Sequence, residues 1–73
     1  MILIDKNSIG KSYKCRGIQK AFVTITSYNE DSDYPVEGIL YQEDKAPARM
    51  KFSKFGNYLN QNESVYDLVS MLE

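Results

Sequence analysis

The sequence predicts an α+β domain: a small antiparallel sheet of three to four strands with one C-terminal amphipathic helix packed on one face. Two observations predict it. Residues 12–54 contain short segments rich in β-branched and aromatic residues, separated by clusters of Gly, Pro, Asn and Asp, as in strands joined by turns. Residues 63–73 instead carry apolar side chains at helical spacing, and one such helix covers one face of a small sheet.

The first half of the chain predicts two or three strands. The apolar run MILI at residues 1–4 predicts a short strand, followed by a turn region at residues 7–11. Residues 12–28 are rich in β-branched and aromatic side chains and predict one long bent strand or two. Gly17 interrupts this segment, and we expect a bulge there because a strand interior tolerates glycine best at such a position.

The next segments alternate between turns and strands. Asn, Asp, Ser and Pro cluster at residues 29–35 and predict a loop, after which VEGILYQ at residues 36–42 predicts a strand. EDKAP at residues 43–47 predicts a turn and ARMKFSK at residues 48–54 another strand. This last strand alternates cleanly, with Ala48, Met50 and Phe52 on one face and Arg49, Lys51 and Ser53 on the other.

The helix is predicted from ESVYDLVSMLE at residues 63–73. Four apolar residues follow the spacing i, i+3, i+4, i+7 and form a stripe on one helix face: Val65, Leu68, Val69 and Leu72. Ser64 with Asp67 three residues later resembles a capping box with the shorter acid. Residues 55–62, FGNYLNQN, predict at most a short helical turn, because Gly and Asn disfavour a longer one.

A single helix covers only one face of the sheet, so the other face is predicted to be open. We expect the helix to pack on Ala21, Val23, Ile25, Met50 and Phe52. The open face then carries Phe22 and the basic residues of the last strand, joined by Ile39 and Tyr41 or else by Leu40, because residues 36–42 are apolar in both phases. This surface is too apolar to be only solvated, which predicts that part of it is covered by a second copy of the chain, by a folded-over N-terminal strand or by a separate partner.

Length and composition predict the class and compartment. Seventy-three residues make one domain, residues 1–73. The 42% of hydrophobic and 26% of charged residues are ordinary for a globular protein. Cys15 is the single cysteine, which excludes an internal disulfide and favours a reducing cytoplasm. The apolar start is too short for a signal-peptide core or a membrane span, so we expect no membrane association.

Charges are sorted along the chain although the formal net charge is only -1. Residues 1–28 carry five basic side chains against Asp5, whereas residues 29–44 carry six acidic side chains and no basic one. Residues 45–54 are again basic. Two interpretations follow: salt-bridged neighbouring strands, or a basic patch flanked by acidic loops.

DKNSIGKS at residues 5–12 resembles a phosphate-binding loop with one letter changed. A phosphate loop requires glycine at the first position and a helix after the Lys-Ser pair. Here Asp5 replaces the glycine and a strand-like segment follows Ser12, so the sequence predicts an exposed turn. NEDSD at residues 29–33 likewise lacks the glycine, glutamate and flanking helices of a calcium loop, and predicts a polar loop.

Few catalytic chemistries are open to this chain. It has no histidine, which excludes Ser-His and Cys-His nucleophile pairs and imidazole metal ligands. Lys14 and Arg16 beside Cys15 favour a reactive thiol, but a lone cysteine in a strand is more typical of a small packed residue. We therefore expect no enzyme, no cofactor and no metal.

Two binding functions remain. The first is a non-catalytic protein-interaction module that binds a protein partner, or a second copy of itself, through the open sheet face. The size, acidic isoelectric point and composition suit a small phage or mobile-element protein that binds and inhibits a host factor. The alternative is a sheet module for single-stranded nucleic acid, disfavoured by the acidic net charge. The candidate partner-binding residues are Lys20, Phe22, Thr24, Tyr41, Arg49 and Lys51.

Overall fold

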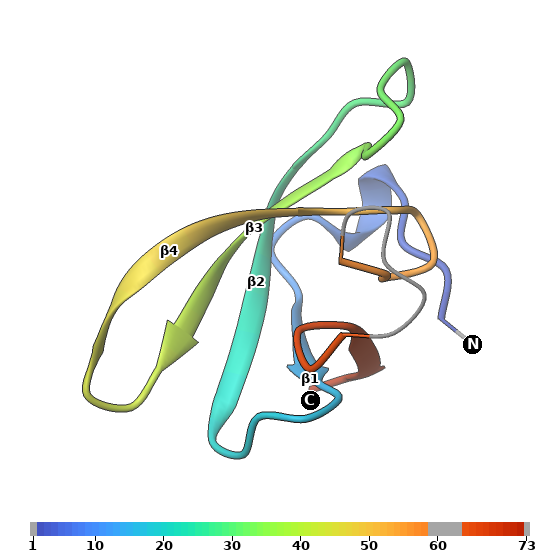
Figure 1. The fold of residues 1–73 in the computed structure, drawn as a ribbon. Coiled ribbons are helices and arrows are strands. Elements are labelled where there is room, and N and C mark those ends of the chain that lie inside the picture. Colours follow the sequence, from blue (N-terminus) through green and yellow to red (C-terminus); the bar gives the residue numbers. More distant parts are fainter. Residues whose placement is uncertain (1, 59–63, 73) are drawn as a thin grey trace.

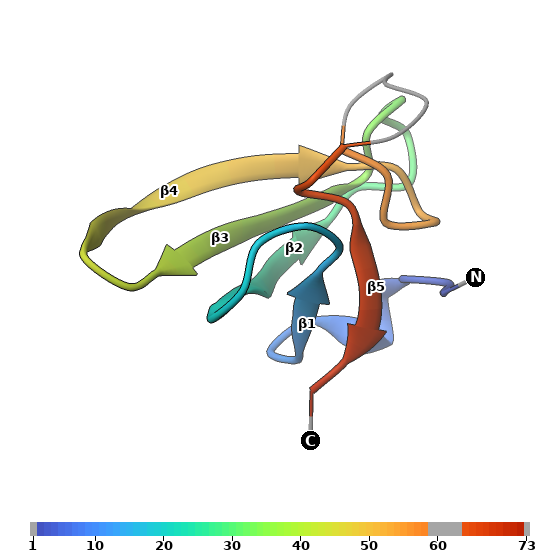
Figure 2. The ribbon, with the colours of Figure 1, turned by 60° about the horizontal axis from the view of Figure 1, so that its bottom comes forward.

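Five antiparallel strands form one curled sheet in the computed structural model, which describes residues 2–58 and 64–72 (Figure 1). The strands lie in the order β4-β3-β2-β1-β5, as Figure 2 shows from the side. Their bounds are Ser12–Cys15 for β1, Ala21–Tyr28 for β2, Val36–Gln42 for β3, Lys45–Phe52 for β4 and Leu68–Met71 for β5. A single 3-10 turn, η1 (Lys6–Ser8), is the one helical element of the described residues.

The predicted C-terminal helix is wrong, and with it the α+β fold class, because the described residues form a nearly all-β structure. Residues 64–67 make a turn in which the Asp67 N–H donates to the Ser64 carbonyl at 3.1 Å. Leu68–Met71 then pair with β1 as strand β5. Glu63 and Glu73, the ends of the predicted helix, lie outside the described residues, as do residues 59–62 of the predicted short helical turn.

Pairing with β1 explains why the helical pattern does not prevail. An isolated helix of about ten residues is marginal in water, and the two valines lower its propensity further. Strand β5 instead satisfies the backbone of β1 and places Leu68 opposite Cys15 in the core. Of the four apolar residues of the predicted stripe only Leu68 is buried, so the periodicity does not correspond to a buried face.

The remaining strand predictions hold in part. Residues 36–42 coincide with β3, and residues 12–28 divide into β1 and β2, with Gly17 in the connection between them and not at a bulge. A side chain at Gly17 would meet Val65 at 2.7 Å, so close chain approach explains the glycine. Residues 2–4 form no strand, which corrects the predicted first strand, whose Met1 lies outside the described residues. Strand β4 begins within the predicted turn, at Lys45.

The core lies on the concave side of the curled sheet. It contains Ile4, Tyr13, Cys15, Ala21, Val23, Ile25, Val36, Leu40, Met50, Phe52 and Leu68. The prediction that alternate residues of β2 and β4 face the core is confirmed, although Ala48 is exposed. For β3 the structure decides between two phases that the sequence left open: Leu40 is buried, and its neighbours Ile39 and Tyr41 point to the opposite face.

Residues 53–58 cover the core in place of the predicted helix, and they link the two edges of the sheet. Phe52 at the end of β4 forms a bridge with Tyr58, and the Leu68 N–H of β5 donates to the Gly56 carbonyl at 2.8 Å. The Ile4 N–H donates to the Lys54 carbonyl at 2.7 Å. Gly56 has a φ of +84°, a conformation that favours glycine. The sheet therefore closes over its own core at this end.

Candidate binding surface on the outer sheet face

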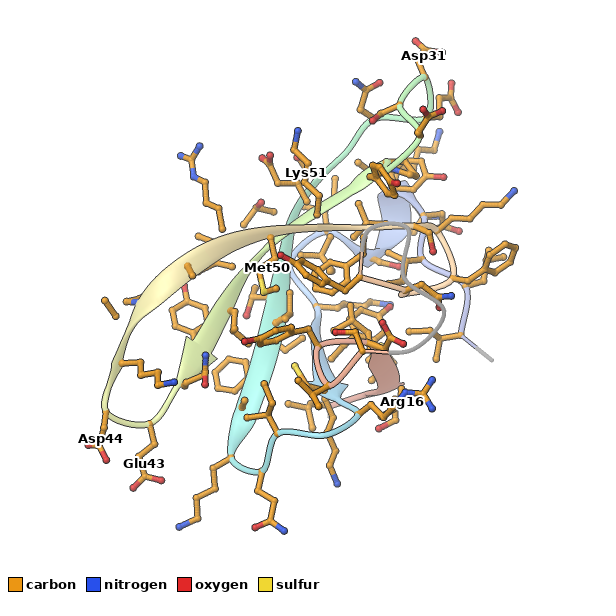
Figure 3. The ribbon with its side chains drawn as sticks, viewed as in Figure 1. Arg16, Asp31, Glu43, Asp44, Met50 and Lys51 are labelled. Atoms are coloured by element: carbon orange, nitrogen blue, oxygen red, sulfur yellow. The ribbon has the colours of Figure 1, made fainter. Side chains whose placement is uncertain are left out.

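The face opposite the core, here called the outer face, collects five of the six predicted binding residues. Because side chains alternate along a strand, the residues between the buried positions project together to this side. The outer face is formed by Ser12, Lys14, Phe22, Thr24, Glu37, Ile39, Tyr41, Arg49 and Lys51. Figure 3 shows the alternation on β4, where Met50 and Lys51 leave opposite sides of the strand.

An aromatic pair lies on the outer face near the end of β3 that leads into the β3–β4 turn. Phe22 and Tyr41 are direct cross-strand neighbours, with ring centroids 5.3 Å apart and an interplanar angle of 28°. Their exposed fractions are 36% and 37%, so each ring is packed on one side and open to solvent on the other. Lys14 lies opposite Phe22 on β1 and extends this row by one strand.

A second row crosses four strands next to the aromatic pair. Ser12, Thr24, Ile39 and Arg49 are successive cross-strand partners on β1, β2, β3 and β4. The Ser12 and Thr24 hydroxyls are hydrogen-bonded at 2.8 Å. At the usual strand spacing, four strands span about 14 Å. The row therefore brings an apolar residue, two hydroxyls and a guanidinium into one continuous strip.

The basic residues of the outer face form no ion pair with the carboxylates of the described residues. Within residues 2–58 and 64–72, no carboxylate lies within ion-pair distance of Lys14, Arg49 or Lys51. Glu37 is the cross-strand neighbour of Lys51, and its carboxylate also accepts a hydrogen bond from the Ser27 hydroxyl at 3.4 Å. These cations are exposed and available to a partner.

Lys20 is the predicted binding residue that the structure does not bring to the outer face. It sits in the turn before β2 with a φ of +58°, in the left-handed region. Its ammonium lies 3.7 Å from the Glu43 carboxylate at the β3–β4 turn. Ile39 and Lys14, by contrast, belong to the outer face. The sequence already assigns Lys14 to the basic residues of the nucleic-acid alternative, whereas the two apolar phases of β3 leave the side of Ile39 open.

Five acidic side chains lie at the two ends of the β2–β3–β4 hairpins, whereas Glu37 lies on the outer face itself. The β2–β3 loop holds Glu30, Asp31 and Asp33, and the β3–β4 turn holds Glu43 and Asp44. Figure 3 shows Asp31 at one extremity of the molecule and the β3–β4 turn at another. Only two ion pairs join described residues. Of the two interpretations of the charge pattern, a basic patch flanked by acidic loops agrees better with this arrangement.

Neither loop motif forms a ligand site of the type it resembles. Asp5 caps η1 by accepting the Asn7 N–H at 2.8 Å, and Ser12 begins β1, so no helix follows the Lys-Ser pair. In the β2–β3 loop the Asn29 side chain accepts the Asp31 N–H at 3.2 Å, as in an Asx turn, between two strands. Both segments are turns, as predicted.

Three further features of the described residues bear on function: the cysteine thiol, groups of metal-ligating side chains and helices that could span a membrane. Cys15 is buried, and burial raises the pKa of its thiol, which disfavours the reactive thiolate. Over the described ranges, no three His, Cys, Asp or Glu residues are grouped to hold a metal ion. The described part of the chain also contains no helix of the length and apolar character needed to cross a bilayer.

Comparison of the chain with protein-family models, with curated proteins and with solved structures gave no match. The function is therefore inferred from the geometry of the outer face.

Proposed function

We propose that this chain is a non-catalytic protein-interaction module that binds a protein partner through the outer face of its sheet. The observation that supports the proposal is the partly exposed aromatic pair, Phe22 and Tyr41, beside Ile39 on a face whose cations lie in no ion pair among the described residues. Aromatic residues and arginine are enriched at protein interfaces, and partly exposed aromatics next to Ile39 supply an apolar centre.

The same residues define the chemistry of the partner. An apolar patch packs on Phe22, Ile39 and Tyr41, and carboxylates around it pair with Lys14, Arg49 and Lys51. The acidic loops at the hairpin ends repel an acidic partner there and so restrict it to the sheet. A small phage or mobile-element protein that covers a host factor in this way fits the size and composition. The buried, unpaired Cys15 suits a reducing cytoplasm.

Site-specific photocrosslinking in the native cell tests the proposal. A benzophenone amino acid is introduced at Tyr41 and, as a control, at Asp31 in the β2–β3 loop tip. We expect a protein adduct at position 41 that is absent at position 31 and that disappears when Arg49 and Lys51 are both changed to Glu. An adduct of twice the chain mass identifies the partner as a second copy. Identical adducts at both positions, or none at position 41, contradict the proposal.

Single-stranded nucleic acid is the second candidate. It is favoured by the two rows of outer-face residues, which run across the strands. A strand that runs across β1 to β4 passes Lys14 and the aromatic pair in one row and reaches Arg49 in the next, while the β2–β3 loop lies off this path and the β3–β4 turn borders its aromatic end. Exposed rings offer stacking surface to bases, and the cations neutralise phosphates.

Fluorescence polarisation of a labelled single-stranded oligonucleotide at low and moderate salt tests this candidate. Lys51→Glu is expected to weaken binding several-fold and to reduce its salt dependence, because one phosphate contact is lost. Lys6→Glu, the same charge change in η1, serves as the matched control and leaves binding nearly unchanged. Absence of binding at low salt excludes nucleic acid and leaves the protein partner.

A further inference from the structure

Arg16 lines a cleft of about 390 Å³ that is separate from the outer face. The other lining residues are Ile2, Phe55, Asn57, Leu68 and Val69, so four of the six lining residues are apolar and none of the described ones is acidic. None of them belongs to the outer face, and Figure 3 shows Arg16 well apart from Lys51. The volume is at the small end of the range for ligand pockets, which suits a small molecule or a single residue of a larger one.

The buried carboxylate of Asp67 holds Arg16 in place. Asp67 is 1% exposed, and its two oxygens accept the Tyr58 N–H at 2.8 Å and the Ser64 N–H at 3.0 Å. The Arg16 backbone N–H donates to the Asp67 carbonyl at 2.7 Å, and the Arg16 Nε lies 3.6 Å from Asp67 Oδ2. Backbone groups fix the carboxylate, and the guanidinium lies within ion-pair distance of it.

Arg16 keeps most of its hydrogen-bonding capacity. The Nε edge faces Asp67, whereas the two terminal nitrogens carry four N–H groups and make no hydrogen bond within the described ranges. The side chain is 49% exposed. A second cation, Lys54, lies 5.3 Å from the centroid of the Phe55 ring, which forms one wall. The cleft therefore combines apolar side chains with a guanidinium that faces Asp67 through Nε and leaves its terminal N–H groups open to a ligand.

We propose that this cleft binds a monocarboxylate with an apolar body, either a free acid or the C-terminal residue of a peptide. The terminal nitrogens of Arg16 match the two oxygens of a carboxylate, which they bind in bidentate fashion. The apolar body packs on Ile2, Phe55 and Val69. A phosphate, which carries more charge, would need further donors, and the lining adds only the Asn57 side chain.

Two-dimensional amide NMR of the full chain, titrated with N-acetyl-leucine, tests the proposal. We expect saturable shifts of the Arg16, Leu68 and Val69 amides. N-acetyl-leucinamide, which has the same body without the charge, is expected to bind at least about tenfold more weakly, because a charge-assisted hydrogen-bond pair is lost. Equal binding of acid and amide, or no saturable shift at the solubility limit of the acid, overturns the proposal.

Matched variants separate the cleft from other sites. Arg16→Gln is expected to reduce the affinity for N-acetyl-leucine at least about tenfold, whereas Arg49→Gln, the same change on the outer face, leaves it unchanged. Phe55→Ser keeps the contact between Arg16 and Asp67 and weakens binding several-fold by removing a wall, so it provides the test if Arg16→Gln does not fold. Unchanged affinity in both cleft variants contradicts the assignment.

A short peptide distinguishes the two sources of the carboxylate. Ala-Ala-Ala-Leu with a free C-terminus is compared with the same peptide amidated at its C-terminus. Tighter binding of the free peptide than of N-acetyl-leucine supports a chain end as the ligand, and loss of binding relative to N-acetyl-leucine supports a free acid. Equal binding of the free and the amidated peptide counts against carboxylate recognition.

Discussion

At the scale of single residues, Asp67 joins three separate parts of the chain. Its carboxylate accepts backbone hydrogen bonds from Tyr58 and Ser64 and faces the guanidinium of Arg16. Ser64 and Asp67 were predicted to cap a helix, and the Ser64 hydroxyl does accept a backbone hydrogen bond, from Tyr66 at 3.1 Å. The same local hydrogen-bonding capacity therefore stabilises a turn, because Ser and Asp side chains serve both structures.

Asp67→Asn is expected to lower the free energy of unfolding by about 2–4 kcal/mol. An amide presents one donor where two acceptors are needed, so one buried N–H loses its partner and the charge-assisted bond is weakened. This is a large part of the total stability of a domain of this size, about 4–11 kcal/mol. Urea denaturation measures it.

Asp31→Asn is the matched control for this measurement. Asp31 is exposed in the β2–β3 loop, and the same substitution there is expected to change the free energy by less than about 0.5 kcal/mol. Equal denaturation midpoints for the two variants would show that the Asp67 carboxylate is not structural.

The residues of the outer face differ in how far their positions could be predicted from the sequence. Phe22, Thr24, Arg49 and Lys51 were assigned to one face because alternation within a strand is a local property. Lys20 was misplaced because its position depends on where β1 ends and β2 begins. Ile39 was left open because both phases of β3 are apolar, so only packing decides which of them is buried.

At the scale of elements, β5 is the segment whose structure depends most on its neighbours. It pairs with β1 through an irregular register, in which Lys14 lies opposite Ser70 and Cys15 opposite Leu68. Val69 is exposed at this irregularity, next to the buried Leu68. A helix would have placed both side chains on one apolar face. The different burial of Leu68 and Val69 therefore distinguishes the strand from the helix.

Leu68→Asp is expected to unfold the domain, whereas Val69→Asp is expected to cost less than about 1 kcal/mol. The first variant buries an unpaired carboxylate in the core, which costs several kcal/mol, and the second places it in solvent. Thermal melts followed by circular dichroism and amide NMR dispersion measure both. If this segment were a helix, both variants would lose much of their folding stability. Comparable destabilisation of the two variants would therefore contradict strand β5.

At the scale of the whole molecule, the fold is held together by contacts between distant parts of the chain. Strand β1 pairs with β5, and residues 53–58 connect to β5 and to the N-terminal segment at Ile4. These contacts close a loop that spans most of the sequence. Local helical structure contributes almost nothing among the described residues, where η1 is a single turn.

This topology predicts cooperative unfolding and slow folding. Because the sheet edges are linked through one core, circular dichroism and tyrosine fluorescence are expected to report coincident denaturation curves. Sheet-rich small domains with many non-local contacts fold in milliseconds to seconds, which stopped-flow refolding measures. Two separate transitions, or a helical signal formed in the dead time, would be incompatible with the single closed sheet.

The distribution of charge is a further property of the whole molecule. The sequence shows acidic and basic segments, but only the hairpin topology places five acidic residues at the ends of the strands and leaves Glu37 as the acidic residue of the outer face among Lys14, Arg49 and Lys51. This separation is what allows the outer face to attract an anionic or acidic partner although the net charge is -1.

Strands β2 and β3 and the second half of β4 can be recognised from the sequence alone, together with the faces of β2 and β4. The reason is that strand propensity and the alternation of side chains involve residues close in sequence. The tertiary structure alone decides that residues 68–71 are a strand, that Leu40 is buried and that residues 53–58 close the sheet. Each of these outcomes depends on a backbone or side-chain partner from a distant part of the chain, and such a partner outweighs a marginal local preference.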